Sequence, residues 1–221
     1  MALYGERVMA IAEAQAWVGA SAGAGGTVTA TYGSTPTQGN LLIACGRGTN
    51  AFSNATLSGW TLAVQSFSTS GGSPIAIWYK IAGAAEPTAV TLLWTSSANI
   101  NLSIGEYSGM TAAPLDQTGT NPSDGITSLS KSSGTITSPT IYPYELCIAF
   151  IGMAGGLGTI TYGDGFTLRN APATAVSFVA SKIVYQKGLY SFGCTHTTTR
   201  IGGGVIATFA GKDQHGLLGM L

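Results

Sequence analysis

Two carboxylates, Glu106 and Glu145, are the best candidates for paired acid–base chemistry, because each lies beside a run of β-forming residues. Hydrolysis of a glycosidic bond needs two carboxylates about 5 to 9.5 Å apart, one of which acts as an acid. The other acidic residues are mostly isolated and flank turns. A solvated position or a place at a sheet edge explains both residues more simply, so we expect no catalytic pair.

Histidines and cysteines offer little more chemistry. A Ser-His-Asp triad would need His196 or His215, but the sequence has no Gly-x-Ser-x-Gly motif, and His196 lies in a Thr-rich run typical of an exposed strand or loop. Cys45, Cys147 and Cys194 form no Cys-x-x-Cys pair and lie in apolar or small-residue runs, as buried free thiols do. Cys194 and His196 would share one strand face, but a zinc site needs more ligands. We expect no catalytic centre, no metal and no organic cofactor.

The composition combines low charge with high hydrophobicity. Charged residues are 8% of the 221 residues, and 9 Lys plus Arg balance 9 Asp plus Glu. Nucleic-acid-binding proteins normally carry a basic excess, and a membrane span needs roughly 18 apolar residues, so we expect neither nucleic acid nor a membrane as a partner. The 45% of hydrophobic residues is too much for a solvated coil. Weak charge repulsion favours a protein that works inside an assembly.

The elements that must position these residues are predicted to be β-strands. Short runs of β-forming residues recur between clusters of Gly, Pro, Ser and Asn, which is typical of a β-sandwich. In the run 75–81, Ile75, Ile77, Tyr79 and Ile81 share one face. Helix is disfavoured by the abundance of Gly and Thr. Only residues 5–17 are a helical candidate, and a strand or an extended arm suits them equally well.

Internal similarity is the main signal. Four segments recur in the same order at offsets between 102 and 106: 40–45 with 145–150, 59–62 with 165–168, 77–80 with 183–186, and 104–109 with 206–211. We predict an all-β, jelly-roll-like β-sandwich built from two internally repeated halves. Each copy lacks the strands to close a core alone, so the two should pack together through a pseudo-two-fold axis. Trp60 and Phe166 should occupy equivalent core sites, and Tyr79 and Tyr185 should be core residues as well.

This duplication divides the chain into an N-terminal arm or first strand at 1–25, a first half at 26–111, a linker at 112–133, a second half at 134–211 and a tail at 212–221. Residues 26–211 form one globular domain. The tail follows the last repeated strand, so the repeat does not need it, yet it contains four large apolar residues: Leu217, Leu218, Met220 and Leu221. Such residues on a loose segment need a covering surface, and we expect them to dock the protein into an oligomer or onto a partner.

The strings GNLLIACGRG, SGWTLAVQS and IWYKIAGAAEPTAVTLLWTSSANINLSIGEYSGM resemble a β-sandwich domain widespread in tailed bacteriophages and their prophages. The family pattern combines a G-D/N-L-L strand, a P-x-G-W-T-L turn, a Y-Y-K strand with a following Glu-Pro, and an A-Y-x-G strand. This chain keeps Gly39 to Leu42, Gly59 to Leu62, Tyr79, Lys80, Glu86, Pro87, Tyr107 and Gly109, but Leu57-Ser58 replace the Pro segment of the turn. These motifs mark turns and core positions rather than a site.

The resemblance implies a protein of the virion, not an enzyme. We expect a capsid decoration (cement) protein that binds the major capsid protein or neighbouring virion subunits and forms a homo-oligomer, with a trimer favoured. The alternative is a receptor- or glycan-binding module of a phage tail or fibre, in which Trp17, Trp78 and Trp94 could form a stacking platform for sugars. Burial of these tryptophans in a contact between subunits or in the second layer of the sandwich is the competing interpretation. A hydrolase acting on surface polysaccharide is the least favoured hypothesis.

Overall fold

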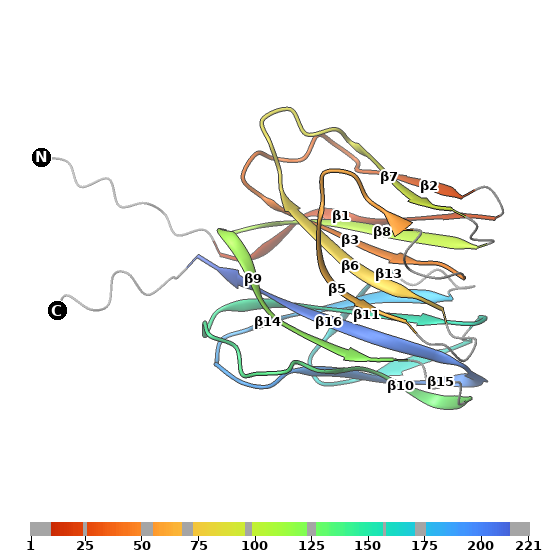
Figure 1. Ribbon diagram of the computed structural model, residues 1–221. Helices are drawn as coiled ribbons and strands as arrows, with labels where there is room; N and C mark the ends of the chain where they lie inside the picture. The colour runs from red at the N-terminus through yellow and green to blue at the C-terminus, as the bar shows by residue number, and fades with distance from the viewer. Residues whose placement is uncertain are drawn as a thin grey trace, which may run out of the picture.

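The computed structural model describes residues 10–23, 26–49, 55–67, 73–95, 99–122, 127–156, 158–170 and 176–212. Every regular element in these ranges is a β-strand, and the strands form four antiparallel sheets (Figure 1). The predicted all-β, sandwich-type fold is therefore confirmed. Within the same ranges there is no helix long and apolar enough to cross a membrane.

Eight strands build the first half of the chain. Five of them form a sheet in the order β1-β8-β3-β6-β5, and three form a smaller sheet in the order β2-β7-β4. Their bounds are β1 (Ala12–Ala22), β2 (Thr27–Thr31), β3 (Leu41–Arg47), β4 (Ala55–Thr56), β5 (Thr61–Ser66), β6 (Ile75–Ile81), β7 (Ala89–Trp94) and β8 (Ile100–Ser108).

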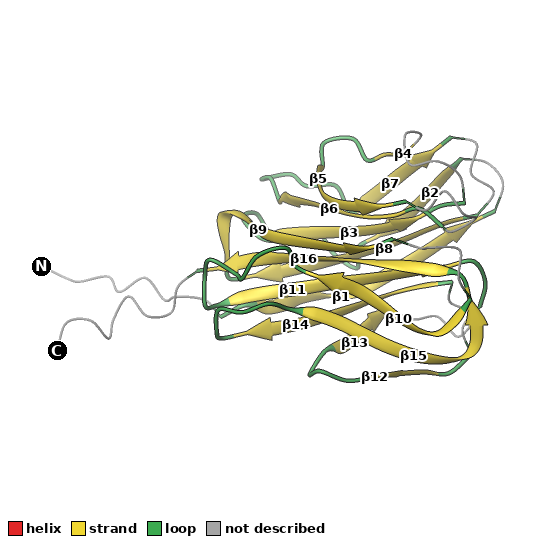
Figure 2. Cartoon of the chain, turned by 60° about the horizontal axis from the view of Figure 1, so that its bottom comes forward, coloured by secondary structure: helices red, strands yellow, loops and turns green. Residues whose placement is uncertain are grey.

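The second half repeats this arrangement strand for strand. Its sheets have the orders β9-β16-β11-β14-β13 and β10-β15-β12, which are the orders of the first half with each strand number raised by eight (Figure 2). The bounds are β9 (Met110–Asn121), β10 (Ser128–Thr135), β11 (Glu145–Met153), β12 (Ile160–Tyr162), β13 (Thr167–Asn170), β14 (Ser177–Val184), β15 (Ser191–Arg200) and β16 (Gly202–Gly211). This repeated topology supports the duplication that we infer from the sequence.

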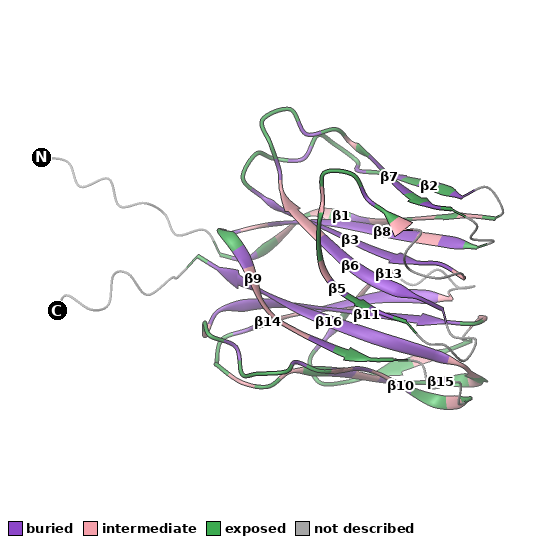
Figure 3. Ribbon diagram, viewed as in Figure 1, coloured by how far each residue is buried: buried purple, intermediate pink, exposed green. Residues whose placement is uncertain are grey.

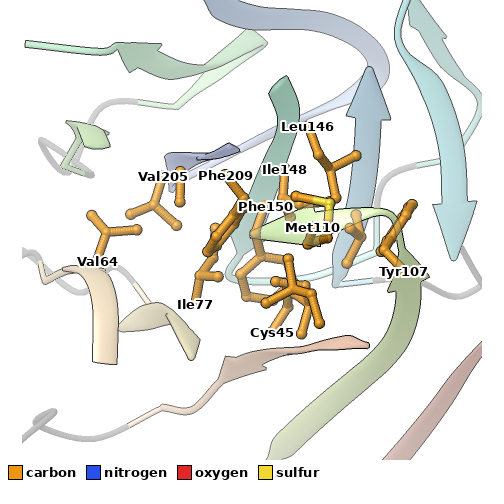
Figure 4. Packing of buried hydrophobic residues seen from close by; sticks show 14 of the residues in the cluster. Cys45, Val64, Ile77, Tyr107, Met110, Leu146, Ile148, Phe150, Val205 and Phe209 are labelled. Carbon is orange, nitrogen blue, oxygen red and sulfur yellow. The ribbon is translucent and has the colours of Figure 1, made fainter. Parts of the chain in front are cut away.

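The four sheets stack as layers, with the two five-stranded sheets in the middle (Figures 1 and 2). Strand β3 shows how one sheet serves two cores, because its side chains alternate. Ile43 and Cys45 face the central core between the halves, whereas Leu42 and Ala44 face the outer core under the small sheet. All of β3 and β11 is buried (Figure 3), and the central core joins residues of both halves (Figure 4). The expectation that one copy cannot close a core is wrong, since each half encloses its own outer core.

The expected linker at 112–133 is also wrong. Residues 110–121 form β9, the edge strand that pairs with β16, and residues 128–135 form β10. The Gly and Pro residues that suggested a loop are accommodated at the edge of the sheet, where Pro114 need not donate a ladder hydrogen bond. The second half therefore begins at Met110. Likewise, the alternatives for 5–17 resolve as strand from Ala12 onward.

Hydrogen-bond registers identify the equivalent residues of the two halves. Thr61 pairs with Tyr79, and Thr167 pairs with Ser181. Tyr79 is thus equivalent to Ser181, at an offset of 102, and the predicted match of 77–80 with 183–186 is wrong. The turn before these strands does repeat as predicted. Trp60 and Phe166 each follow a glycine of positive φ and each lie under the ammonium group of an equivalent lysine, at 5.9 and 5.8 Å from the ring centres.

The four predicted core residues have different outcomes. Phe166 is buried in the outer core of the second half, and Trp60 packs partly buried against that of the first. Tyr79 packs partly buried on the central core, with its ring edge-on to Phe209 at 5.5 Å. Tyr185 is 72% exposed, so its assignment to the core is wrong. It lies one residue beyond the end of β14, where the chain has already turned away from the sheet.

Several contacts between the halves are reciprocal: β1 touches β13 as β9 touches β5, and β6 touches β16 as β14 touches β8. This reciprocity is what a two-fold relation between the halves requires. Polar contacts join the halves as well. Arg169 on β13 pairs with Glu13 on β1 at 2.6 Å and donates from Nε to Ser181 Oγ at 2.7 Å. The hydroxyl of Tyr107 donates to the same Ser181 oxygen at 3.2 Å.

Candidate functional site

The two acids with the strongest sequence case for catalysis hold structural positions in separate halves. Glu106 is fully buried, and its carboxylate accepts hydrogen bonds from Gln15 Nε2 and Asn40 Nδ2, both at 2.5 Å, and from the Thr37 amide at 2.8 Å. Because three donors of the same half bind this carboxylate, its role is structural. Glu145 shares none of these hydrogen-bond partners, so the structure does not bring the two acids together as a pair.

Glu145 is nevertheless chemically unusual. It is fully buried at the start of β11, and its Oε1 accepts a hydrogen bond from the Tyr142 amide at 3.3 Å. Burial, reinforced by the neighbouring Asp116 carboxyl, raises the pKa of Glu145 to about 8. Asp116 in turn accepts a hydrogen bond from the Ile141 amide at 2.7 Å. The two acids thus hold the segment 141–144, which leads into β11.

The remaining candidates for chemistry are buried. His196 is 5% exposed on β15, with Nδ1 2.6 Å from the Thr198 carbonyl oxygen, so its predicted exposure is wrong. The strand is exposed on one face only, and His196 points to the other. Cys45, Cys147 and Cys194 are free buried thiols, as predicted. The described ranges hold no group of three or more His, Cys, Asp or Glu residues that could bind a metal ion. His215 lies outside those ranges.

The three tryptophans that could have formed a stacking platform for sugars are buried. Trp17, Trp78 and Trp94 are 9%, 4% and 0% exposed, and they fill the central and first outer cores. Trp17 also donates from its indole nitrogen to the Tyr107 hydroxyl at 3.1 Å. Their burial in the layers of the sandwich is the interpretation that the structure supports.

An exposed apolar surface lies instead at the end of the second half where β11 begins. Four large side chains form it, and we call it the terminal patch: Ile141, Tyr142, Tyr185 and Leu189, which are 58%, 49%, 72% and 58% exposed. Two contacts hold its loops together. Thr140 and Gly188 exchange hydrogen bonds of 3.0 and 3.2 Å, and the ring of Tyr185 stacks on Tyr144 at 5.4 Å.

Both ends of the described chain meet beside the terminal patch, at Tyr144. The amide of Ile11 donates to the Tyr144 hydroxyl at 2.6 Å, and the amide of Gly211 donates to the Tyr144 carbonyl oxygen at 2.9 Å. Residues 1–9 and 213–221 are therefore attached to the domain at one place. The predicted docking residues Leu217, Leu218, Met220 and Leu221 lie outside the described residues.

The sequence did not single out the terminal patch. Its residues come from two loops about 45 positions apart in the chain, and nothing in the local pattern shows that these loops meet or that their apolar side chains remain uncovered. Comparison with known proteins adds no identification, since no family model, no curated protein and no solved structure matches the chain.

Proposed function

We propose that this chain is a non-enzymatic structural protein of a tailed-bacteriophage virion, a capsid decoration protein that docks through the terminal patch and its two attached segments. The observation that carries the proposal is the meeting of Ile11 and Gly211 at Tyr144, beside four exposed apolar side chains. Both attached segments are rich in apolar residues. The partner is the major capsid protein or a neighbouring virion subunit, and the protein itself is a homo-oligomer, with a trimer as the favoured state.

Apolar burial supplies enough free energy for such docking. Covering one large apolar side chain contributes about 1.5 to 3 kcal/mol before ordering costs are subtracted. The terminal patch offers four such side chains, and the segment 213–221 brings four more. The low charge of the chain suits the same role, because little electrostatic repulsion opposes dense packing of copies on a shell.

The test is co-sedimentation of the purified protein with capsids that lack it. Replacing both Tyr185 and Leu189 by Ser should weaken binding at least tenfold while the unfolding temperature changes little, because both side chains are exposed. Leu129→Ser is the matched control, since Leu129 is 47% exposed on the outer strand β10, away from the terminal patch. Undiminished binding of the double variant would contradict the proposal.

Deleting residues 213–221 tests the tail separately and leaves the bond from the Lys212 amide to the Gly109 carbonyl oxygen in place. A shortened protein that folds but does not sediment with capsids identifies the tail as an anchor. Binding at the wild-type affinity excludes the tail from docking, and failure to fold assigns it to its own subunit. Light scattering of the wild type and the Tyr185/Leu189 variant then shows whether self-association uses the same surface.

The alternative, a receptor- or glycan-binding module, has no support from the buried tryptophans. One observation does favour ligand binding, namely a cavity with polar side chains at the opposite end of the molecule.

A further inference from the structure

A cavity of about 550 Å³ lies between the halves, at the end of β3 opposite the terminal patch. The first half contributes most of its lining, including Ser21, Thr49, Asn99 and Asn101, and the second half contributes Ala154, Gly155 and Val176. This volume is within the range of sites for small organic ligands, about 300 to 1,000 Å³. Six of the twelve lining residues carry hydroxyl, amide or guanidinium groups, so the cavity can hold a ligand with polar groups.

Arg47, the last residue of β3, lines this cavity and is only 4% exposed. Its Nη1 donates to Asn101 Oδ1 at 3.3 Å and its Nη2 donates to Ser73 Oγ at 2.7 Å, whereas its Nε has no partner in the described ranges. No carboxylate pairs with it there, since the ion pairs of those ranges are Lys80–Glu86 and Arg169–Glu13. Burial lowers the pKa of Arg47 to about 10, which still leaves it cationic at neutral pH.

The surrounding sequence supplies no counter-ion either. Five segments adjoin the cavity-lining residues, and none contains Asp or Glu: 19–30, 48–54, 67–74, 95–101 and 170–176. A buried guanidinium without a negative partner is costly, because it has lost most of its hydration and regains, among the described residues, two side-chain hydrogen bonds to neutral groups. An anion in the cavity would offset that cost.

The fold itself does not require this arginine. Arg47 pairs with Ile75 and Asn101, and the register of the second half places Gly152 at the equivalent position, paired with Ser177 and Gly203. Gly152 itself packs against Ile75 and Arg47, since a Cβ on it would lie 2.3 Å from Ile75 Cγ2 and 3.3 Å from Arg47 Cγ. A residue needed only to build the repeat would recur in both halves, so Arg47 has a separate role.

We propose that this cavity binds a small sugar acid, with the ligand carboxylate on Arg47 and the ligand hydroxyls on the amides and hydroxyls of the lining. The guanidinium selects a planar carboxylate through paired N–H donors. The volume exceeds the needs of a bare oxyanion and fits a ligand of one or two sugar residues. This binding goes beyond the docking role and does not depend on it.

Isothermal titration of the full chain with glucuronate, glucose and sodium sulfate tests the proposal. Glucuronate should bind, and glucose should bind at least tenfold more weakly because it lacks the carboxylate. Arg47→Met should weaken glucuronate binding at least tenfold. Lys187→Met is the control, because it removes an exposed positive charge beyond the other end of β14 and should leave binding unchanged.

Ser21→Trp provides a second variant if Arg47→Met does not fold. Ser21 is exposed on the cavity lining, so an indole there should obstruct the cavity, leave Arg47 in place and abolish binding. Equal affinities for glucuronate and glucose would overturn the proposal. It would be overturned equally by sulfate binding as tightly as glucuronate, or by no binding of glucuronate at all.

Discussion

Replacement of Glu145 by Gln tests how the buried acid at the start of β11 controls stability. Burial and the Asp116 carboxyl raise the pKa of Glu145 from 4.5 to about 8, so the folded protein favours the neutral acid. Gln has the same shape, is neutral at every pH and offers an N–H donor where the protonated acid offers O–H. The substitution should therefore be nearly silent at low pH and stabilising at high pH.

The sign and size follow from proton linkage. Because the folded pKa exceeds the unfolded one, the contribution of Glu145 to stability is fully present below about pH 4.5 and is lost as the pH rises through about 8. The full difference corresponds to about 4 to 5 kcal/mol. Entry of water and local relaxation reduce such values, so we expect the Glu145→Gln variant to gain about 2 to 4 kcal/mol over the wild type between pH 5 and pH 8.5.

Thermal unfolding at pH 5, 7 and 8.5 measures this gain. For a chain of 221 residues, about 2 to 4 °C per kcal/mol converts it to a relative increase of roughly 4 to 16 °C at pH 8.5. Glu106→Gln is the control in the other half. Its carboxylate accepts from three N–H donors, so an amide there should destabilise the protein at every pH. The reasoning fails if the difference between Glu145→Gln and the wild type is the same at pH 5 and pH 8.5.

Two further predictions concern packing and reactivity. Gly105→Ala should lower the free energy of unfolding by about 1 to 3 kcal/mol in urea titrations, because its Cβ would lie 2.3 Å from Trp17 Cε2. Gly163→Ala is the control and should change the free energy of unfolding far less, because a Cβ there would have nothing within 4 Å. Burial raises the pKa of Cys45 and Cys147 well above the ordinary thiol value, so a disulfide reagent should label them only as the protein unfolds; rapid labelling of the native protein at pH 8 would contradict their burial.

Sequence patterns predict the strands well wherever burial is two-sided or periodic. The apolar runs of β3 and of its equivalent β11 are recognisable as strands because a strand covered on both faces is apolar along its whole length. The predicted equivalence of the two Gly-aromatic turns also holds, because a residue of positive φ followed by an aromatic side chain that packs on the core is a local requirement. These features depend on neighbours in sequence, which is why a single chain reveals them.

The failed match of Tyr79 with Tyr185 shows the limit of such patterns. Equivalent residues are offset by 106 at Thr61 and Thr167 but by 102 at Tyr79 and Ser181, because the connection from β13 to β14 is shorter than that from β5 to β6. Loop length is weakly constrained, and a short motif of Ile and Tyr matched by coincidence at 106, the offset that holds for Thr61 and Thr167. Only the hydrogen-bond register, which the sequence does not display, corrects it.

The candidate sites were harder to predict than the fold, because each is defined by a group that is absent from its surroundings: a carboxylate near the buried guanidinium, or side chains that would cover the apolar patch. Arg47 is one of nine basic residues, and its interest lies in the absence of a carboxylate around a buried guanidinium. The five segments without Asp or Glu were a usable signal, but only once the structure showed that the residues lining the cavity meet at one end of the sandwich. The exposure of Ile141 and Leu189 likewise depends on two loops that meet through tertiary hydrogen bonds.

Divergence between equivalent positions separates functional residues from those that build the repeat. The register makes Tyr144 equivalent to Gly39 and Tyr185 equivalent to Gly83, so the end of the second half at the terminal patch carries two aromatic rings, one buried and one exposed, where the first half has glycine. In the cavity the difference is reversed, with Arg47 in the first half and Gly152 in the second. Exposed Tyr185 and buried Arg47 are each carried by one copy only, at opposite ends of the same sandwich, so the repeat does not require them, and contacts outside the chain account for both.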